Sequence, residues 1–187
     1  VPVGKGSMLA ILGAKIKDIS DLLNSFKEKG VCEIANDNAD GQVIVSGDKD
    51  SVVSFQSLLK EKKIKSIPLK VSAPFHCSLM KSAADKMSYK IKNTNFRSPT
   101  HSILSNVTAK IEKNPENIKK LLIDQIFSTV KWRESLIKMQ DNRVNNFIEI
   151  GPGKVLIGMV KRTVKGANCF SINSIADMKN FINEFKK

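Results

Sequence analysis

Cysteine and histidine are scarce in this 187-residue chain, and their spacing excludes several kinds of site. The three cysteines, Cys32, Cys77 and Cys169, are odd in number and far apart, which fits neither a disulfide framework nor a metal site. The two histidines are His76 and His101. We therefore expect a reducing, cytoplasmic location, no bound metal and no cofactor.

Long apolar runs are also missing. No stretch approaches the ~18 consecutive apolar residues of a membrane-spanning helix, and no charged segment followed by an apolar core marks a signal peptide. Hydrophobic residues make up 41% and charged residues 26% of the chain, as in globular rather than disordered proteins. We expect a folded protein without membrane association.

Arginine is rare although the chain is strongly basic. The formal net charge is +13, but only four of the 31 basic residues are arginines, namely Arg97, Arg133, Arg143 and Arg162. Arginine is the preferred residue for bidentate contacts to phosphates and base edges. We therefore expect no nucleic-acid partner, and the lysine-rich charge suits an acidic protein instead.

The first 70 residues predict a small α/β subdomain. Ile19, Leu22, Leu23 and Phe26 are spaced i, i+3, i+4, i+7, as on the apolar face of a helix. Residues 36–41 have turn chemistry and would connect a hairpin. The elements expected are strands at 7–12, 31–35, 42–46 and 65–71, with helices at 18–29 and from residue 47 onward. This β-α-β-β-α-β order is that of a ferredoxin-like unit.

Residues 71–187 predict a second, different part. The elements expected are helices at 79–91, from residue 114, and at 132–139, 155–164 and 176–185, with strands at 103–104, 147–150 and 169–173. Alternating helices and strands indicate parallel pairing. Three strands are few for so many helices, and the chain begins with Val1 rather than Met. We expect that a further N-terminal part of the protein precedes this sequence.

His76 is the leading candidate for chemistry. It lies between a predicted strand and a predicted helix, and Pro74 restricts the backbone of the loop that holds it. Loops of this kind carry functional residues in α/β proteins. From the residues alone, a purely structural histidine remains an open alternative. His101 lies in a polar segment, where a solvated histidine is the simpler interpretation.

The chain resembles the malonyl-CoA:acyl carrier protein transacylases over nearly its whole length. Five collinear segments carry the resemblance: residues 1–13 (VPVGKGSMLAILG), 36–47 (NDNADGQVIVSG), 71–80 (VSAPFHCSLM), 125–132 (QIFSTVKW) and 149–156 (EIGPGKVL) with Lys161-Arg162. The resemblance implies an α/β fold: a ferredoxin-like small subdomain at 1–70 and the C-terminal part of an α/β-hydrolase-like large subdomain at 71–187.

The resemblance also implies an activity and its residues. The family transfers malonyl from CoA, through a seryl ester, to the phosphopantetheine thiol of acyl carrier protein in fatty acid biosynthesis. The residue that matches the catalytic base is His76, and the matching orienting group is the backbone carbonyl of Gln125. Phe75, Asn36 and Asn38 match substrate-pocket positions. For the two asparagines, a role confined to the β-turn is the alternative, and Phe75 is expected to favour malonyl over methylmalonyl groups.

Three features of the family are missing from the 187 residues. These are the Gly-His-Ser-x-Gly nucleophile motif, the N-terminal Gly-Gln-Gly segment of the oxyanion hole, and the arginine that pairs with the malonyl carboxylate. We therefore expect the chain alone to be inactive, with the missing N-terminal half as a partner and exposed apolar surface that favours self-association.

Of two functions of other classes, the first stays open and the second is disfavoured. The chain could be a non-catalytic module that binds acyl carrier protein or a complementary N-terminal fragment. RNA binding on the predicted sheet would require aromatic residues on its strands, and residues 7–12, 31–35 and 42–46 contain none.

Overall fold

The computed structural model describes residues 2, 4–27 and 29–185. Parts of the predicted segments 1–13 and 18–29 therefore lie outside the described residues. The chain divides into two compact units, Val1–Ser135 and Leu136–Lys187, and each is described by itself. The subdomain boundary expected between residues 70 and 71 stays a prediction.

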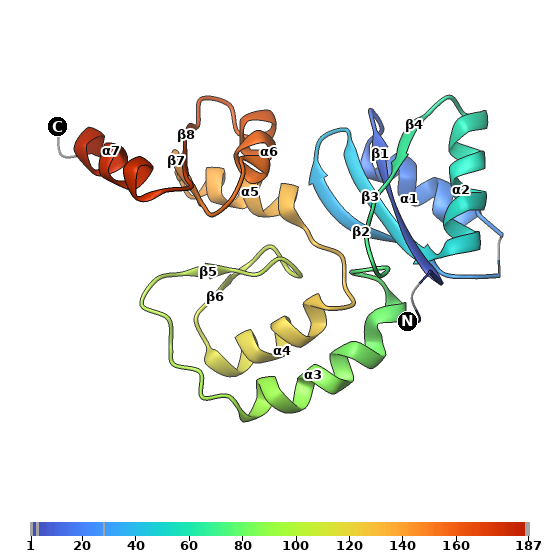
Figure 1. Ribbon diagram of the computed structural model, residues 1–187, viewed down its shortest axis with the longest axis horizontal. Coiled ribbons are helices and arrows are strands. Elements are labelled where there is room, and N and C mark those ends of the chain that lie inside the picture. Colours follow the sequence, from blue (N-terminus) through green and yellow to red (C-terminus); the bar gives the residue numbers. More distant parts are fainter. Residues whose placement is uncertain (1, 3, 28, 186–187) are drawn as a thin grey trace. The chain divides into compact units, whose positions relative to one another are not determined.

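The first unit contains a four-stranded sheet. Its strands are β1 (Gly6–Leu12), β2 (Cys32–Ala39), β3 (Gln42–Asp48) and β4 (Lys65–Pro68), in the order β2-β3-β1-β4 with every neighbouring pair antiparallel. Helix α1 (Ile16–Ser25) connects β1 to β2, and α2 (Lys49–Glu61) connects β3 to β4 (Figure 1). The predicted β-α-β-β-α-β order is present.

Both helices pack on one face of this sheet. The sheet contributes the buried residues Leu9, Ile11, Val43 and Val45, and the helices contribute Ile19, Val52, Phe55 and Leu59. Phe26 and Phe55 meet edge to face with ring centroids 5.1 Å apart. The alternation of apolar residues along β1 and β3 thus turns one side of each strand toward the helices.

The strand β2 corrects one prediction. Residues 36–39 were expected in a turn, but they continue β2, and the turn is confined to Asp40-Gly41. The strand is irregular here, with register shifts between Ile34 and Asn36 and between Asp37 and Ala39. These bulges, together with a parallel bridge between Asn36 and Val130, keep polar residues in an extended conformation.

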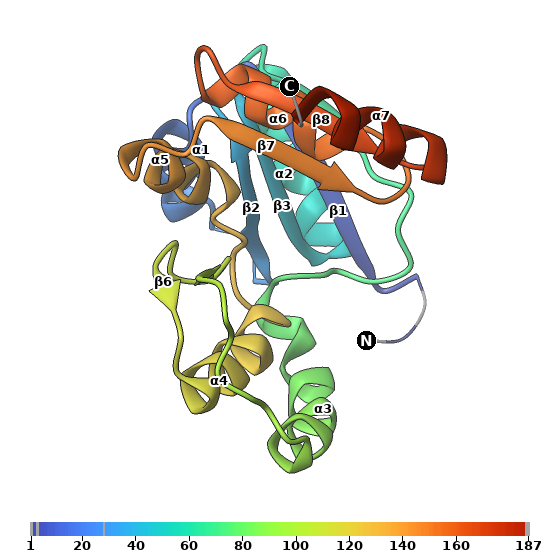
Figure 2. The ribbon, with the colours of Figure 1, turned by 90° about the vertical axis from the view of Figure 1, so that its left-hand side faces the viewer.

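The rest of the first unit is mainly helical. After β4 come a short 3-10 turn, η1 (Ser78–Met80), and α3 (Lys81–Asn93), followed by the small hairpin of β5 (Ile103–Leu104) and β6 (Ile111–Glu112). Helix α4 (Pro115–Gln125) lies beside α3 (Figures 1 and 2). The Asn114 side chain accepts hydrogen bonds from Glu116 N and Asn117 N, which explains why α4 begins there. Helix α5 (Trp132–Asp141) crosses the boundary between the units.

The second unit is built on a parallel strand pair. The strands β7 (Asn146–Ile150) and β8 (Asn168–Ile172) are joined by α6 (Val155–Thr163), and α7 (Ile175–Phe185) follows. The predicted parallel pairing is confirmed for the strands expected at 147–150 and 169–173. It is wrong for the strand at 103–104, which pairs antiparallel in the β5–β6 hairpin. The Glu149 carboxylate accepts from the backbone N–H groups of Leu156 and Ile157 at the start of α6. No helix among the described residues is long and apolar enough to span a membrane.

Candidate active site: the His76 loop and the Gln125 carbonyl

The loop that carries His76 is seated on β1. Pro74 is fully buried and packs on Gly6, where a Cβ atom would lie 2.3 Å from Pro74 Cδ. Cys77 is also fully buried, and its thiol donates to Pro74 O at 3.2 Å. Burial raises the pKa of the Cys77 thiol, so this side chain is a neutral packing group. The proline expected to restrict the loop does so through these contacts.

His76 itself is held in an unusual conformation. Its φ is 61°, in the left-handed region that non-glycine residues seldom adopt. The ring is half-buried, and Nδ1 lies 2.9 Å from the backbone oxygen of Gln125. A carbonyl oxygen can only accept, so Nδ1 carries the proton in this contact. In the neutral ring, Nε2 is then left with a lone pair that can take a proton.

The carbonyl of Gln125 is available because Gln125 is the last residue of α4. The last four carbonyls of a helix have no partner within it. They also form the negative end of the helix dipole, which favours a positive charge nearby. The acceptor is therefore suited to both the neutral ring and the imidazolium. Asn106 steadies the Gln125 side chain by donating from Nδ2 to Oε1 at 3.3 Å.

The other predicted site residues lie on two elements. Phe75 precedes His76 on the loop and is 38% exposed. Asn36 and Asn38 stand on β2, the first half-buried and the second buried. Among the described residues, no hydrogen bond joins either asparagine side chain to His76. His101 is exposed, as expected for a solvated residue.

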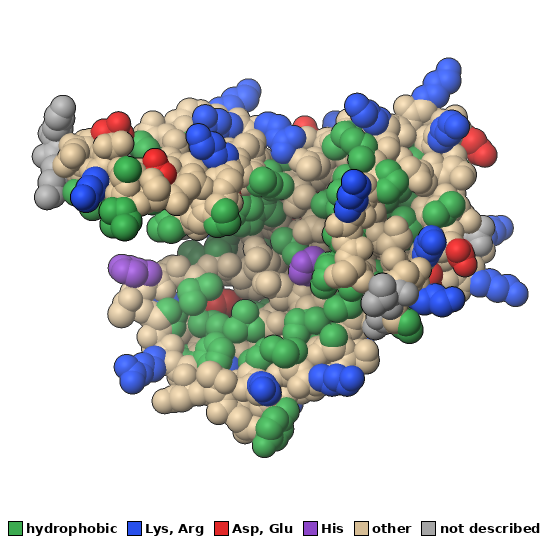
Figure 3. Space-filling view, in the orientation of Figure 1, with side chains coloured by type: hydrophobic (Ala, Val, Ile, Leu, Met, Phe, Trp, Pro, Cys, Tyr) green, Lys and Arg blue, Asp and Glu red, His purple; other side chains and the backbone are tan. Residues whose placement is uncertain are grey.

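A cavity of about 190 Å³ borders Gln125. It lies between the β5–β6 hairpin and α4, and its apolar lining consists of Ile103, Leu104, Ile118, Leu121 and Leu122. Figure 3 shows hydrophobic side chains gathered over this part of the first unit. Four polar residues, Ser105, Asn106, Glu112 and Gln125 itself, complete the lining, so the end of α4 borders a cavity of mixed character.

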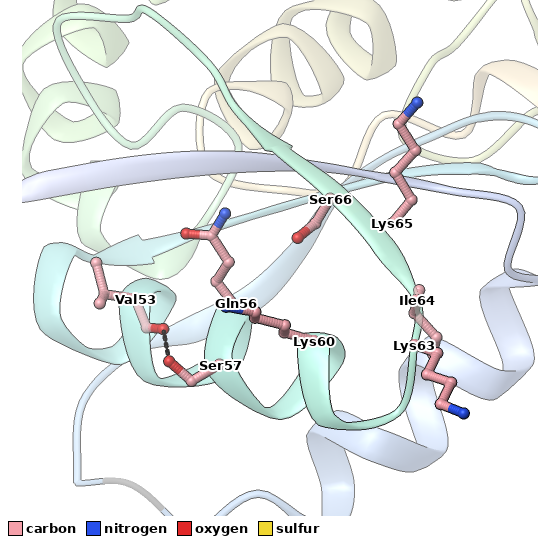
Figure 4. A pocket seen from close by; sticks show the side chains of 8 residues that line it. All are labelled: Val53, Gln56, Ser57, Lys60, Lys63, Ile64, Lys65 and Ser66. Carbon is pink, nitrogen blue, oxygen red and sulfur yellow. Dashed lines mark hydrogen bonds between the residues drawn. The ribbon is translucent and has the colours of Figure 1, made fainter.

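A second cavity has a different character. It lies between α2 and β4 and is lined by Lys60, Lys63 and Lys65 together with Gln56 and Ser57 (Figure 4). Lysines surround it without converging, and the Ser57 hydroxyl donates to Val53 O of its own helix. None of the predicted site residues lines this cavity.

Comparison with known proteins decides the family. The model of the acyl transferase domain family matches residues 6–186. Malonyl CoA-acyl carrier protein transacylase of Haemophilus influenzae is 38% identical over 186 residues, which is 99% of this chain and 59% of that protein. The Bacillus subtilis protein of the same name is 40% identical over 164 residues, which is 87% of this chain and 52% of that protein.

Solved structures agree. The structure of acyl-carrier-protein-S-malonyltransferase from Bartonella henselae has a TM-score of 0.94 at 34% identity, over all of this chain and 60% of that one. FabD from Acinetobacter baumannii has a TM-score of 0.92 at 36% identity, over 98% of this chain and 59% of that one. The chain belongs to the malonyl-CoA:acyl carrier protein transacylase family.

This family member spans about 59% of the length of the Haemophilus relative. The expected resemblance is thereby confirmed, and so is an α/β architecture. A malonyl-transacylase solved in complex with a type II polyketide acyl carrier protein is also similar, with a TM-score of 0.93 at 32% identity, over 98% of this chain and 60% of that one.

Four residues around the His76 site were not found from the sequence. Glu33 and Ser78 hydrogen-bond to each other, and Asp37 forms an ion pair with Arg133. Each pair joins residues far apart in the chain, and no local pattern indicates such a contact. Within the described part of the chain, no group of three or more metal-ligating side chains occurs.

Proposed function

We propose that this chain provides the general base of malonyl transfer between CoA and acyl carrier protein. The observation that supports this most directly is the contact between His76 Nδ1 and Gln125 O at 2.9 Å. It holds the ring by one nitrogen and leaves Nε2 for proton transfer. A backbone carbonyl thereby takes the orienting part that an aspartate plays in a Ser-His-Asp triad.

In the first half-reaction, Nε2 takes the proton of the serine hydroxyl as its oxygen attacks the malonyl thioester carbon. The tetrahedral intermediate then expels the CoA thiolate, which takes that proton back from Nε2. The second half runs the same way, with the phosphopantetheine thiol as nucleophile and the serine oxygen as leaving group. Nδ1–H donates to Gln125 O throughout, so the ring keeps one orientation. The serine belongs to the family's Gly-His-Ser-x-Gly motif, which these 187 residues do not contain.

We assign the acyl pocket to Phe75, Asn36 and Asn38. A phenyl ring beside the base would crowd an α-methyl group, and steric exclusion of one methyl is worth about 1–3 kcal/mol. The amides of the two asparagines could hydrogen-bond the malonyl group. In this assignment residues 1–70 are the small ferredoxin-like subdomain. Residues 71–187 are the C-terminal part of an α/β-hydrolase-like subdomain.

Acyl carrier protein and malonyl-CoA are the proposed partners, in the cytoplasm and without a further cofactor. The net charge of +13 supports an acidic partner, because complementary charge accelerates encounter. Docking of this kind weakens as salt is added.

A fusion tests the proposal. The part of the Haemophilus relative outside the match would be joined in frame to this chain, and malonyl transfer from malonyl-CoA to acyl carrier protein would be measured. We expect the fusion to transfer malonyl and the chain alone not to. His76→Ala should lower kcat of the fusion by about 10²- to 10⁴-fold, while His101→Ala, at an exposed histidine, leaves it unchanged. A fusion that keeps full activity without His76 refutes the role of the base.

A second function, that of a non-catalytic binding module, is favoured by the second unit. Its strand pair and helices leave large apolar side chains in solvent: Ile150 is 79% exposed, Ile175 70% and Val155 66%. Parallel strands are normally covered on both faces. Light scattering measures the mass of the chain alone and of the chain mixed with the separately produced part of the Haemophilus relative that lies outside the match. It distinguishes a chain that associates with itself from one that binds this fragment.

A further inference from the structure

A buried ion pair fixes the middle of β2. Asp37 is 1% exposed, and Arg133 Nε donates to both of its carboxylate oxygens, at 3.0 Å to Oδ1 and 3.1 Å to Oδ2. Arg133 Nη2 adds a contact of 2.9 Å to Oδ2. Hydrogen bonding to Asp37 raises the pKa of Arg133. This bidentate geometry fixes the direction as well as the distance between the two residues.

The same contact fastens the segment that follows Gln125. After α4 ends, the chain runs along the edge of β2 before α5 begins (Figure 1). Three hydrogen bonds hold it there: Val130 N to Ala35 O at 2.8 Å, Asp37 N to Val130 O at 2.9 Å, and Thr129 Oγ1 to Ile34 O at 2.6 Å. The Asp37–Arg133 pair adds a further contact to β2 just C-terminal to these three hydrogen bonds.

The loop of His76 is fastened to β2 as well. Glu33 Oε2 accepts from Ser78 N at 2.8 Å, and Glu33 Oε1 accepts from Ser78 Oγ at 2.6 Å. Ser78 opens η1, two residues after His76. A left-handed histidine needs such support, because its backbone conformation is unfavourable and persists only where its surroundings impose it.

We propose that Glu33 and Asp37 are positioning residues that hold the two partners of the His76–Gln125 hydrogen bond. Glu33 holds the His76 loop. Asp37, through Arg133, holds the segment that follows Gln125 and thereby constrains the end of α4, where the Gln125 carbonyl lies. Because Glu33 and Asp37 both lie on β2, this strand fixes the position of the base and that of its acceptor. This inference rests on the proposed function, since it explains how the proposed base is oriented.

The readout is the tautomer of His76 in the isolated chain. With only two histidines, ¹⁵N-histidine labelling gives two ring systems, and exposed His101 is the internal reference. The ratio of Nδ1–H to Nε2–H forms in the neutral ring reports the contact with Gln125 O. It is independent of malonyl transfer, so failure of the fusion and failure of this inference are separate results.

The variants remove charge; Asp37→Asn and Glu33→Gln keep the side-chain size, and Arg133→Gln shortens the side chain. We expect Asp37→Asn with Arg133→Gln to lower the His76 tautomer ratio by about two- to tenfold, as for the loss of one ordinary hydrogen bond. Glu33→Gln should lower it in the same direction. The matched control is Glu134→Gln, which removes the partially exposed pair of Glu134 with Lys131 beside Arg133.

Two results obtained with folded variants overturn the inference. One is a folded charge-removal variant, checked by circular dichroism, whose tautomer ratio equals that of the unchanged chain. The other is an equal loss in the Glu134→Gln control. If the double variant does not fold, Asp37→Leu with Arg133→Met replaces the pair by apolar side chains. Loss of folding in both would show that the pair is structural and would refute positioning by Asp37.

Discussion

The packing of the His76 loop against β1 can be tested by the substitution Gly6→Ala, which adds one methyl group. In Gly6→Ala, the new Cβ would lie 2.3 Å from Pro74 Cδ, 2.4 Å from Cγ and 2.8 Å from Cβ. Carbon atoms in contact are separated by about 3.5–4 Å, so the proline ring must move by about 1 Å. Gly6 does not have the positive φ that would itself disfavour alanine, which makes the perturbation purely steric.

Overpacking of this kind costs about 1–3 kcal/mol of unfolding free energy. For a chain of this size, each kcal/mol lowers Tm by about 2–4 °C, so we expect a decrease of about 2–12 °C by calorimetry. The displaced loop should also lengthen the 2.9 Å contact between His76 Nδ1 and Gln125 O. The His76 tautomer ratio should therefore fall together with Tm.

A double-mutant cycle isolates this contact. Pro74→Ala removes the two ring atoms that meet the new methyl most closely, so the pair of substitutions should be less damaging than the sum of the single ones, by about 0.5–3 kcal/mol. A Gly6→Ala chain with unchanged Tm, or strictly additive effects in the cycle, would refute the steric account.

Three other predictions concern groups outside the His76 site. Gly158, in α6, has no neighbour within 4 Å of a built Cβ, so Gly158→Ala should raise the unfolding free energy by about 0.5–1 kcal/mol in denaturant titrations; a destabilised variant contradicts this. Hydrogen bonds, first of all from the Asn173 backbone, lower the pKa of Asp177 below its usual value of 3.8. The stabilisation that Asp177 gives to the start of α7 is therefore present above pH 3.8 and is lost as pH falls further; amide exchange of α7 as a function of pH should show this loss, and Asp177→Asn should abolish it. Burial raises the pKa of Cys32 to about 12 and also raises that of Cys77. Both thiols should therefore react slowly with a disulfide reagent at mild pH, while Cys169 reacts faster, and equal labelling of all three in the native chain is the contrary result. The free energy of unfolding should also fall as pH rises from about 9 toward 12.

The sheet and its two helices were predictable because their signals are local. The spacing of Ile19, Leu22 and Phe26 indicates a helix without any knowledge of its partners. The continuation of β2 through Asn36 was not predictable, because it is stabilised by a bridge to Val130, which is far away in the sequence. The strand β6 was also missed, since two residues at Ile111–Glu112 carry no periodicity.

The candidate site divides in the same way. Pro74 marks the His76 loop locally, and the resemblance to the transacylases supplied Gln125 as the acceptor. The contacts that hold these two groups join residues 45 positions apart in one case and 96 in the other. Asp37 and Glu33 look like ordinary polar residues of a turn and a strand until the fold places them, and no pattern in the sequence indicates their partners.

The most direct measurement of the central claim is the tautomer of His76 in the unchanged chain, read by ¹⁵N NMR of its two histidine rings. We expect the neutral form of the His76 ring to be protonated at Nδ1, which lies 2.9 Å from Gln125 O, with Nε2 free, and the exposed His101 ring to lack this preference. A His76 ring protonated mainly at Nε2, or one indistinguishable from His101, would contradict the claim that Gln125 O orients His76 as a base.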